Sequence, residues 1–424
     1  MDHILQNNVN VKLSDLVSLS TSVNRRIERR FIKHPEHKFH GHAWVQYKGM
    51  PFPTLQMINQ DYLGVSMSDD LRAKLIAFLC QNGYGRSSNI LYGGTSVVHE
   101  ELEKIICQMF HTEMTIITPS CADANMSSIN TFCPAGSYII SDESVHNSIV
   151  DGCRLSKATK LIFKHNDMND LKIKLRLVPM MTKKMILCDG IYSMDAEACN
   201  LPEILKLADI YNANIYIDDA HATGVIGPNS LGTADYFGID LATHKNIIIA
   251  SAFSKAIQST GGFITGSRAL LKCIPYDSSL ICHGAPVGVS AVAALHMFQL
   301  IKAGVQDRLV QLNDNIKRLK SGLKNIDLEV IHHVGPFVVI MLRNLYDTFM
   351  FTEILFQSGL HVAPAVFPIV PKNKATIRLM ITAGMTSDDI DFAISCFVKV
   401  VDILHDDIKS SFYSYVDPVN IKVE

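Results

Sequence analysis

Hydrophobic and polar positions follow a regular rhythm in the first two thirds of the chain. From about residue 112 to 266, short apolar runs alternate with amphipathic stretches. This pattern is typical of parallel strands, buried on both faces and joined by crossover helices. The predicted strands are Met114–Thr118, Tyr138–Ser141, Leu161–Lys164, Met185–Asp189, Asn214–Asp218, Asn246–Ser251 and Gly262–Thr265.

Helical spacing appears between the strands and again after them. Apolar residues recur every three or four positions from Leu201 to Tyr211, behind Pro202, which suits a first helical turn. Residues 287–324 have the pattern of a long helical segment interrupted at Gly304. Further strands and helices are then predicted at Leu328–Ile331, Phe337–Leu342, Asp347–Ser358, Thr376–Thr382 and Ser387–Leu404.

These elements divide the chain into three parts. Residues 1–55 are predicted to be a polar N-terminal arm without strands, and residues 56–286 a large α/β domain. That domain has a mostly parallel central sheet with helices on both faces. Residues 287–424 are predicted to be a smaller C-terminal α+β domain.

Composition narrows the class of protein. Of the 424 residues, 48% are hydrophobic and 19% charged, which supports large buried cores and excludes general disorder. The 39 basic and 41 acidic residues nearly cancel, so nucleic acid is not an expected partner. No apolar run reaches the roughly 18 residues of a membrane span, and the first residues lack the features of a signal peptide. We therefore expect a cytoplasmic protein without a transmembrane segment.

Cysteine and histidine usage bears on redox state and metal binding. The 10 cysteines never form a C-x-x-C pair, which indicates reduced, packed thiols. Four of the 17 histidines lie between His34 and His42, together with Pro35 and Gly41. Since neither paired cysteines nor a carboxylate-rich spacing supports ligation, a solvated loop is preferred to a metal centre, and no metal is predicted.

Polar residues follow several of the predicted strands. They lie at Ser120, Asp142 to His146, Ser193, Asp218 to His221 and Ser251 to Lys255. Each has an ordinary explanation alone, such as a helix N-cap or a surface charge. Because ligands of parallel sheets collect at the carboxyl ends of strands, their joint position favours a binding site.

Lys255 suggests which chemistry this site performs. It lies between two predicted core strands, where poor hydration lowers the pKa of an amine and frees it to form a Schiff base. With Asp218 at a neighbouring strand end, this favours pyridoxal phosphate, whose ring nitrogen pairs with a carboxylate. The alternative is a nucleotide-binding α/β protein, but Gly83-Tyr84-Gly85 lacks the third glycine of that motif and follows no clear strand.

Several segments, in this order, resemble the α-oxoamine synthases. They are Asn59 to Gly64, Gly94-Thr95 with His99 and Leu102-Glu103, Asp189 to Asp195, Asp218 to Gly224 and Phe253-Ser254-Lys255. The family includes aminolevulinate synthase, 8-amino-7-oxononanoate synthase, glycine C-acetyltransferase and serine palmitoyltransferase. The resemblance covers about residues 55 to 400 and implies a fold-type-I pyridoxal phosphate transferase, a homodimer with active sites at the subunit interface.

The resemblance assigns roles residue by residue. Lys255 is similar to the lysine that binds the cofactor, and Asp218 to the partner of its ring nitrogen. His221 would contact the phenolic oxygen of the ring, with Ser193 beside it, and His146 would stack on the ring. Arg378 resembles the arginine that binds the substrate carboxylate, and Gln60 lies near the substrate.

Other positions depart from the family pattern. Cys121 and Ala122 stand where many members have glycine and an aromatic residue, and Ala252 replaces a hydroxyl residue that binds the phosphate. Ser251 or Ser254 would substitute for it. His283 would replace a phosphate-binding threonine offered by the other subunit, and Met385 replaces a common histidine. The phosphate would then depend more on the backbone N–H groups of the helix that follows Ser120, and cofactor affinity would be weaker.

The implied reaction is a decarboxylative condensation of a small α-amino acid with an acyl-CoA or another acyl thioester, which gives an α-aminoketone. Three alternatives remain open: a different pyridoxal phosphate reaction on the same scaffold, a serine-palmitoyltransferase-like or signal-molecule synthase that uses a long acyl chain, and a catalytically quiet regulatory subunit of the same fold.

Overall fold

The computed structural model describes residues 30, 32–33, 43–66, 68–85, 88–90, 92–277, 280, 283–326, 328–367 and 369–408. They form two compact units. The larger unit contains Gln60–Leu312 and His332–Phe337, and the smaller unit contains the described residues up to Asn59, Asn313–Ile331 and those from Val338 onward. The loop from His34 to His42 lies outside the described residues. The three-part division with boundaries after residues 55 and 286 stays a prediction.

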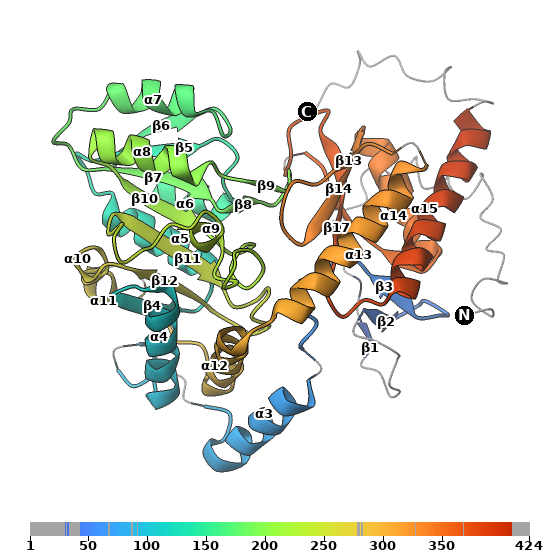
Figure 1. Ribbon diagram of the computed structural model, residues 1–424, viewed down its shortest axis with the longest axis horizontal. Helices are drawn as coiled ribbons and strands as arrows, with labels where there is room; N and C mark the ends of the chain where they lie inside the picture. The colour runs from blue at the N-terminus through green and yellow to red at the C-terminus, as the bar shows by residue number, and fades with distance from the viewer. Residues whose placement is uncertain are drawn as a thin grey trace. The chain divides into compact units, whose positions relative to one another are not determined.

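The larger unit is built on a seven-stranded sheet (Figure 1). In spatial order its strands are β4 (Met114–Thr118), β12 (Gly262–Gly266), β11 (Ile247–Ala252), β10 (Asn214–Asp218), β7 (Lys184–Asp189), β5 (Tyr138–Asp142) and β6 (Thr159–Phe163). From β11 to β6 each strand is parallel to its neighbour, whereas β12 is antiparallel to β11 and β4. The predicted, mostly parallel sheet is confirmed, with each strand bound within two residues of its predicted position.

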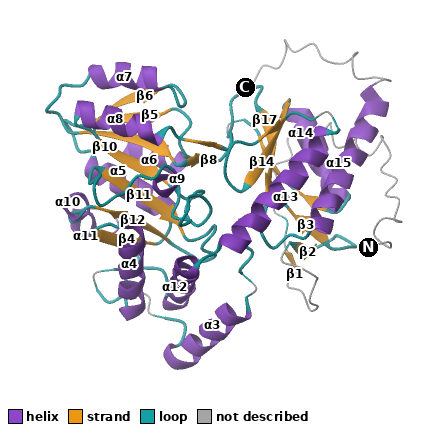
Figure 2. Ribbon diagram, in the orientation of Figure 1, coloured by secondary structure: helices purple, strands orange, loops and turns teal. Residues whose placement is uncertain are grey.

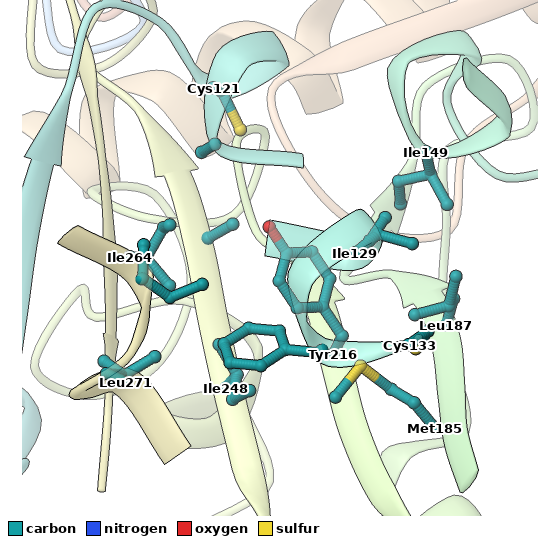
Figure 3. Packing of buried hydrophobic residues seen from close by; sticks show 14 of the residues in the cluster. Cys121, Ile129, Cys133, Ile149, Met185, Leu187, Tyr216, Ile248, Ile264 and Leu271 are labelled. Carbon is teal, nitrogen blue, oxygen red and sulfur yellow. The ribbon is translucent and has the colours of Figure 1, made fainter. Parts of the chain in front are cut away.

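Side chains cover both faces of this sheet. Every residue of β7 and β11 is buried, as expected for parallel strands between two layers of helices. On one face, Met185, Leu187, Tyr216 and Ile248 pack in the same hydrophobic cluster as Ile129 (Figure 3). This cluster holds the helix that carries Ile129 against the middle of the sheet.

Most helices of the larger unit lie beside this sheet, whereas α3 projects away from it (Figure 2). They are α3 (Asp69–Asn82), α4 (Val97–Phe110), α5 (Cys121–Phe132), α6 (Asn147–Leu155), α7 (Met168–Arg176), α8 (Leu201–Tyr211), α9 (Thr233–Tyr236), α10 (Arg268–Leu271), α11 (Ile274–Asp277) and α12 (Gly288–Ala303). Helix α8 confirms the predicted spacing: Asn200 caps it by accepting the N–H of Glu203, Pro202 lies in its first turn, and the left-handed residue Asn212 ends it. A short hairpin, β8 (Ile191–Tyr192) with β9 (Glu197–Ala198), follows β7.

The smaller unit contains two four-stranded sheets. One consists of β13 (Val330–Ile331), β14 (Phe337–Arg343), β17 (Ala375–Met380) and β16 (Ala363–Ala365). The other consists of β1 (Ile32–Lys33), β2 (Trp44–Tyr47), β3 (Thr54–Gln56) and β15 (Leu360–His361). Helices α14 (Leu345–Gln357) and α15 (Ser387–Ile408) agree with the predicted helices, and α13 (Gln306–Lys324) begins beyond the predicted break at Gly304.

The prediction of an arm without strands is wrong for its described residues. β1 and β2 lie in that segment and pair antiparallel, and β2 also pairs with β3. β3 in turn pairs with β15, where Leu55 is the partner of Leu360. Strands of two to four residues are too short to show a hydrophobic period, and β15, the second partner of β3, is far away along the chain. The local pattern therefore could not reveal this sheet.

Two further observations concern membrane spans and thiols. No single helix among the described residues is long and apolar enough to cross a membrane; α12 and α13 meet that criterion only as a bent pair. All nine cysteines in the described part of the chain are free thiols, as predicted, and Cys282 lies outside it.

Glu103 protects the exposed edge of the central sheet. Its Oε1 accepts the N–H of Ile117 in β4 at 3.2 Å, a group that has no neighbouring strand on that side. Burial raises the pKa of Glu103 to about 7, against a weaker lowering by the Ile117 N–H. The folded protein therefore prefers the protonated side chain across a pH range in which the unfolded chain is ionised.

We expect Glu103→Gln to change how stability depends on pH. A carboxyl whose pKa is raised on folding loses its contribution to stability as pH rises from about 4.5 to 7, whereas glutamine keeps the acceptor without the charge. The free energy of unfolding of the variant, relative to the unsubstituted protein, should rise by about 2 kcal/mol between pH 5 and pH 8. Chemical denaturation at both pH values measures this. Glu101→Gln, at an exposed position of the same helix, is the control, and equal pH profiles for Glu103→Gln and the unsubstituted protein would contradict the assignment.

Candidate active site

Neighbouring parallel strands bring the predicted polar residues to one edge of the central sheet. Asp218 ends β10 and Asp189 ends β7, and the two are direct partners in the parallel pair. Lys255 follows the adjacent strand β11 by three residues. Sheets of this type bind ligands at the carboxyl ends of their strands, so this edge is the candidate active site.

Asp218 is a buried carboxylate supplied with several donors. Its side chain is 7% exposed. Oδ2 accepts from Nδ2 of Asn125 at 2.6 Å, and Oδ1 accepts from the N–H of Ala220 at 3.1 Å. The thiol of Cys121 lies 3.6 Å from Oδ1. These donors replace the water that the carboxylate loses on burial.

Regular geometry explains why these groups meet. Cys121 and Asn125 are four residues apart on α5 and share one helix face, while Tyr216 and Asp218 share one face of β10. The hydroxyl of Tyr216 donates to Oδ1 of Asn125 at 3.0 Å. The amide nitrogen of Asn125 also donates to Oγ of Ser148 at 2.8 Å. Asn125 thereby connects the end of β10 with the start of α6.

His146 stands at that start of α6. Its Nδ1 accepts the N–H of Ser148 at 3.3 Å and lies 2.7 Å from Oγ of the same residue, while its ring is exposed. Because a backbone N–H can only donate, a neutral His146 ring carries its proton on Nε2. The N–H of His146 donates to Oδ1 of Asp189 at 3.2 Å.

Asp189 experiences a strongly unfavourable environment for a charge. Burial raises the pKa of Asp189 well above its usual range, and the negative charge of Asp218 raises it further. The N–H of His146 and the ammonium of Lys255 lower it, but they do not outweigh burial. Burial beside the Asp218 carboxylate therefore favours the protonated form of Asp189.

Lys255 lies in a tight turn between β11 and β12. Both the N–H and the side-chain amide of Gln258 donate to its carbonyl, at 2.9 and 2.7 Å. Gly261 closes this turn at φ 124°, where a Cβ would collide with neighbouring side chains. Burial and the Asp218 charge raise the pKa of the Cys121 thiol, and the Lys255 ammonium opposes them. The half-buried Lys255 is therefore electrostatically coupled to both Cys121 and Asp189.

His221 is held on the same edge, three residues beyond β10. It is 8% exposed, and its Nδ1 lies 3.0 Å from the hydroxyl of Tyr62, which is itself buried. The edge of the His221 ring contacts Phe337, with 5.3 Å between the ring centroids. These contacts restrict the imidazole to one orientation.

The first turn of α5 carries an unexpected negative charge. Ser120 caps the helix by accepting the N–H of Asp123 at 3.0 Å, and its hydroxyl donates to Oδ2 of Asp123 at 2.6 Å. Oδ1 of Asp123 lies 3.3 Å from Nδ1 of His283. Ser120 and His283 are thus both engaged with an acid. His283 was predicted to bind a phosphate here, together with the backbone N–H groups of this helix.

Comparisons with known proteins give consistent results. Residues 68–397 match the family described as aminotransferase class I and II. The chain is 35% identical over 350 residues to 8-amino-7-oxononanoate synthase of Thermoanaerobacter pseudethanolicus, which covers 82% of this chain and 87% of that protein. It is 32% identical to a serine palmitoyltransferase of Sphingobacterium spiritivorum, over 81% and 85% of the two chains.

A solved structure agrees in fold. The serine palmitoyltransferase of Sphingomonas wittichii superposes with a TM-score of 0.85, at 22% identity, over 93% of this chain and 97% of that one. The chain belongs to the α-oxoamine synthases. The predicted fold class, pyridoxal phosphate cofactor and C-acyltransferase activity, in which an amino acid condenses with an acyl thioester, are confirmed.

The residues of this α-oxoamine synthase fit pyridoxal phosphate. The donor set contains a buried carboxylate, Asp218, for a protonated ring nitrogen, and an amine, Lys255, for the aldehyde. His221 offers an oriented imidazole for the phenolic oxygen, and His146 offers an exposed ring beside the same edge. The helix start at Ser120 supplies backbone N–H groups for a phosphate.

The other predicted residues are distributed over both units. Ser193 is half-buried between β8 and β9, Ala122 is half-buried in the first turn of α5, and Ser254 is exposed beside Lys255. Gln60 is half-buried and its carbonyl accepts the N–H of Tyr62. All of these lie in the larger unit.

Arg378 and Ser251 differ from these residues, the first in its unit and the second in its burial. Arg378 is half-buried on β17 of the smaller unit, so its proposed role in the α-oxoamine synthase stays a prediction. Ser251 is fully buried, and its hydroxyl donates to the carbonyl of Asp219 at 3.3 Å. Of the two serines considered as replacements for the hydroxyl lost at Ala252, only Ser254 has an exposed side chain.

Sequence reasoning missed four residues of this site. Asn125 carried a usable signal, since it lies one helical turn after Cys121. Asp189 ends a predicted strand beside Asp218 and was noted only as part of a motif. Tyr62 and Asp123 had no local signal, because their partners His221 and His283 are about 160 residues away along the chain.

Proposed function

We propose that this α-oxoamine synthase condenses a small α-amino acid with an acyl-CoA at the edge formed by Asp218 and Lys255. The observation that supports this best is their common electrostatic influence: both act on Asp189 and on Cys121, with opposite signs. The Asp218 carboxylate and the Lys255 ammonium therefore lie near each other, as the chemistry of the cofactor requires.

When bound, pyridoxal phosphate supplies an aldehyde that joins amines and a ring that accepts electrons from the carbon beside the amino group. Lys255 holds the cofactor in the absence of substrate and, once free, its amine takes the proton from the α-carbon of the amino acid. The α-carbon then forms a bond with the acyl carbonyl carbon as the thiolate leaves. The carboxylate departs as CO2, and the ammonium of Lys255 returns a proton to the α-carbon.

Other residues orient the reactants. Asp218 keeps a proton on the ring nitrogen, and His221, fixed by Tyr62, donates to the phenolic oxygen. The exposed ring of His146 would stack on the cofactor, and Ser193 would lie beside it. Arg378 and Gln60 orient the substrate, since a guanidinium binds a carboxylate through two parallel hydrogen bonds.

The alternatives carry less support. A catalytically quiet subunit has no need of the lysine, the acid and the imidazole together, and this chain retains Lys255, Asp218 and His221. A long acyl chain, as in the serine palmitoyltransferase relative, remains the second candidate because of the 32% identity to that enzyme. A screen of amino acids and acyl chain lengths separates the two substrate classes.

We expect Lys255→Ala to abolish release of free thiol from acyl-CoA. The variant lacks the group that moves the α-proton, so the rate should fall by a factor of about 1,000 or more. Thiol release is followed with a chromogenic thiol reagent while glycine, alanine and serine are each offered with acyl-CoA of several lengths.

Lys245→Ala is the matched control for this experiment. It removes an exposed lysine of the same unit, paired with Glu113 on the surface, and should leave the rate unchanged. The proposal is wrong if the unsubstituted protein, loaded with the cofactor, releases thiol with none of the pairs, or if Lys255→Ala remains as active as the control.

Asp123→Asn should tighten binding of pyridoxal phosphate by about three- to tenfold. The substitution removes a negative charge from the first turn of α5, where backbone N–H groups face the phosphate, and it releases His283 from its acidic partner. Equilibrium titration of the cofactor-free protein measures the affinity. Asp170→Asn, in the first turn of α7, is the control, and unchanged or weaker binding by Asp123→Asn would place the phosphate elsewhere.

The active protein is a homodimer of the cytoplasm in this proposal. Family resemblance supports the dimer, and so does α3, which buries only Leu71 and leaves Ile76 and Leu79 55% and 40% exposed. The free thiols support a reducing compartment. Sedimentation at micromolar concentration should give twice the chain mass of 47.0 kDa; a monomer under these conditions would contradict the dimer.

A further inference from the structure

We propose that Asn125 is a positioning residue that holds Asp218 and His146 in one arrangement for the cofactor ring. The inference rests on the proposed function, because it assumes that these two residues contact the ring. It extends that proposal to a residue that contacts neither cofactor nor substrate and acts through its neighbours.

The amide of Asn125 is completely used. The residue has no exposed surface, and its nitrogen donates one hydrogen to Asp218 and the other to Ser148. Its oxygen accepts from Tyr216. A hydroxyl donor on one side and a carboxylate on the other allow only one orientation of the amide, since the flipped orientation would direct its oxygen at the Asp218 carboxylate.

The hydrogen bond to Asp218 is the shortest that this carboxylate receives, at 2.6 Å compared with 3.1 Å from the N–H of Ala220. Asp189 lies on the neighbouring strand, and a buried carboxylate beside another acid needs donors to stay charged. Loss of the Asn125 amide would leave Asp218 with one backbone donor and the weakly donating thiol of Cys121.

The second hydrogen of the amide binds Oγ of Ser148, which in turn contacts the His146 ring. Because Oγ of Ser148 accepts from Asn125, its own hydrogen is directed to Nδ1 of His146, 2.7 Å away. This contact adds to the N–H of Ser148, which itself keeps the proton of the neutral ring on Nε2, and it restricts the plane of the exposed ring. A single buried amide therefore links the residue at the ring nitrogen with the residue that covers the ring face.

The experiment compares three variants of the full chain by a readout that does not depend on catalysis. Asn125→Ser removes both donated bonds, and Asn125→Asp keeps the shape but replaces the donor by an acid beside Asp218. Asn315→Ser is the matched control, because Asn315 is also buried and donates twice, to the carbonyls of Thr382 and Met385 in the smaller unit.

Each variant is titrated with pyridoxal phosphate, and the visible absorbance band of the bound cofactor is followed from pH 5 to pH 9. For Asn125→Ser we expect about tenfold weaker binding and a midpoint pH of the band that differs by half a unit or more from the unsubstituted protein. For Asn125→Asp we expect weaker binding at pH 8 that recovers toward pH 5.5, where a protonated side chain donates again. Asn315→Ser should lower thermal stability without changing affinity or midpoint.

The inference is overturned if Asn125→Ser and Asn125→Asp bind the cofactor and titrate like the unsubstituted protein, or if Asn315→Ser gives the same changes as Asn125→Ser. If Asn125→Ser does not fold, the pH dependence of Asn125→Asp decides alone, and weak binding that does not recover at low pH counts against a positioning role. Failure of the unsubstituted protein to bind pyridoxal phosphate would instead refute the proposed function.

Discussion

The burial of the Asp218 carboxylate is the constraint on which the rest of this site depends. A charge at the end of a central strand loses its water on burial, and hydrogen-bond donors have to take the place of that water. Asn125 and the N–H of Ala220 donate hydrogen bonds to the Asp218 carboxylate, and the cation of Lys255 lies nearby. Burial also gives the charge its strength, because few solvent dipoles screen it from a ring nitrogen.

Sheet topology decides which groups share this small surface. The parallel register of β10 and β7 makes the two acids direct neighbours, and the antiparallel strand β12 requires a tight reversal after β11. Lys255 lies in that reversal, where the hydrogen bonds of Gln258 and the glycine at 261 fix the backbone. The turn thus fixes the backbone of Lys255, which suits a residue whose side chain alternates between two bonding partners.

The two ends of the site are built differently. Around Asp218, Tyr216 and Asn125 every polar group has a partner from a rigid element, which favours one geometry. At the start of α5 an acid, Asp123, occupies the position from which a helix dipole attracts an anion, and His283 partly compensates for it. In the proposed binding mode, the ring would therefore lie at the preorganised end of the site, and the phosphate would lie at the end where an acid weakens its binding.

The sequence by itself determined the order of the central strands, the helix at 201–211 and the family. It also indicated Lys255 and Asp218 as candidate site residues. Those features are recorded in runs of five or more residues or in contiguous motifs, whose period and spacing are local. Tertiary structure decided the pairing of the short strands near residues 32 and 44. It also decided what depends on distant partners: the contact of Tyr62 with His221 and the pairing of Asp123 with His283. Short strands and single side chains show no hydrophobic periodicity, so the local sequence does not reveal their partners. The folded sheet aligns residues that are far apart along the chain, and it alone specifies these contacts.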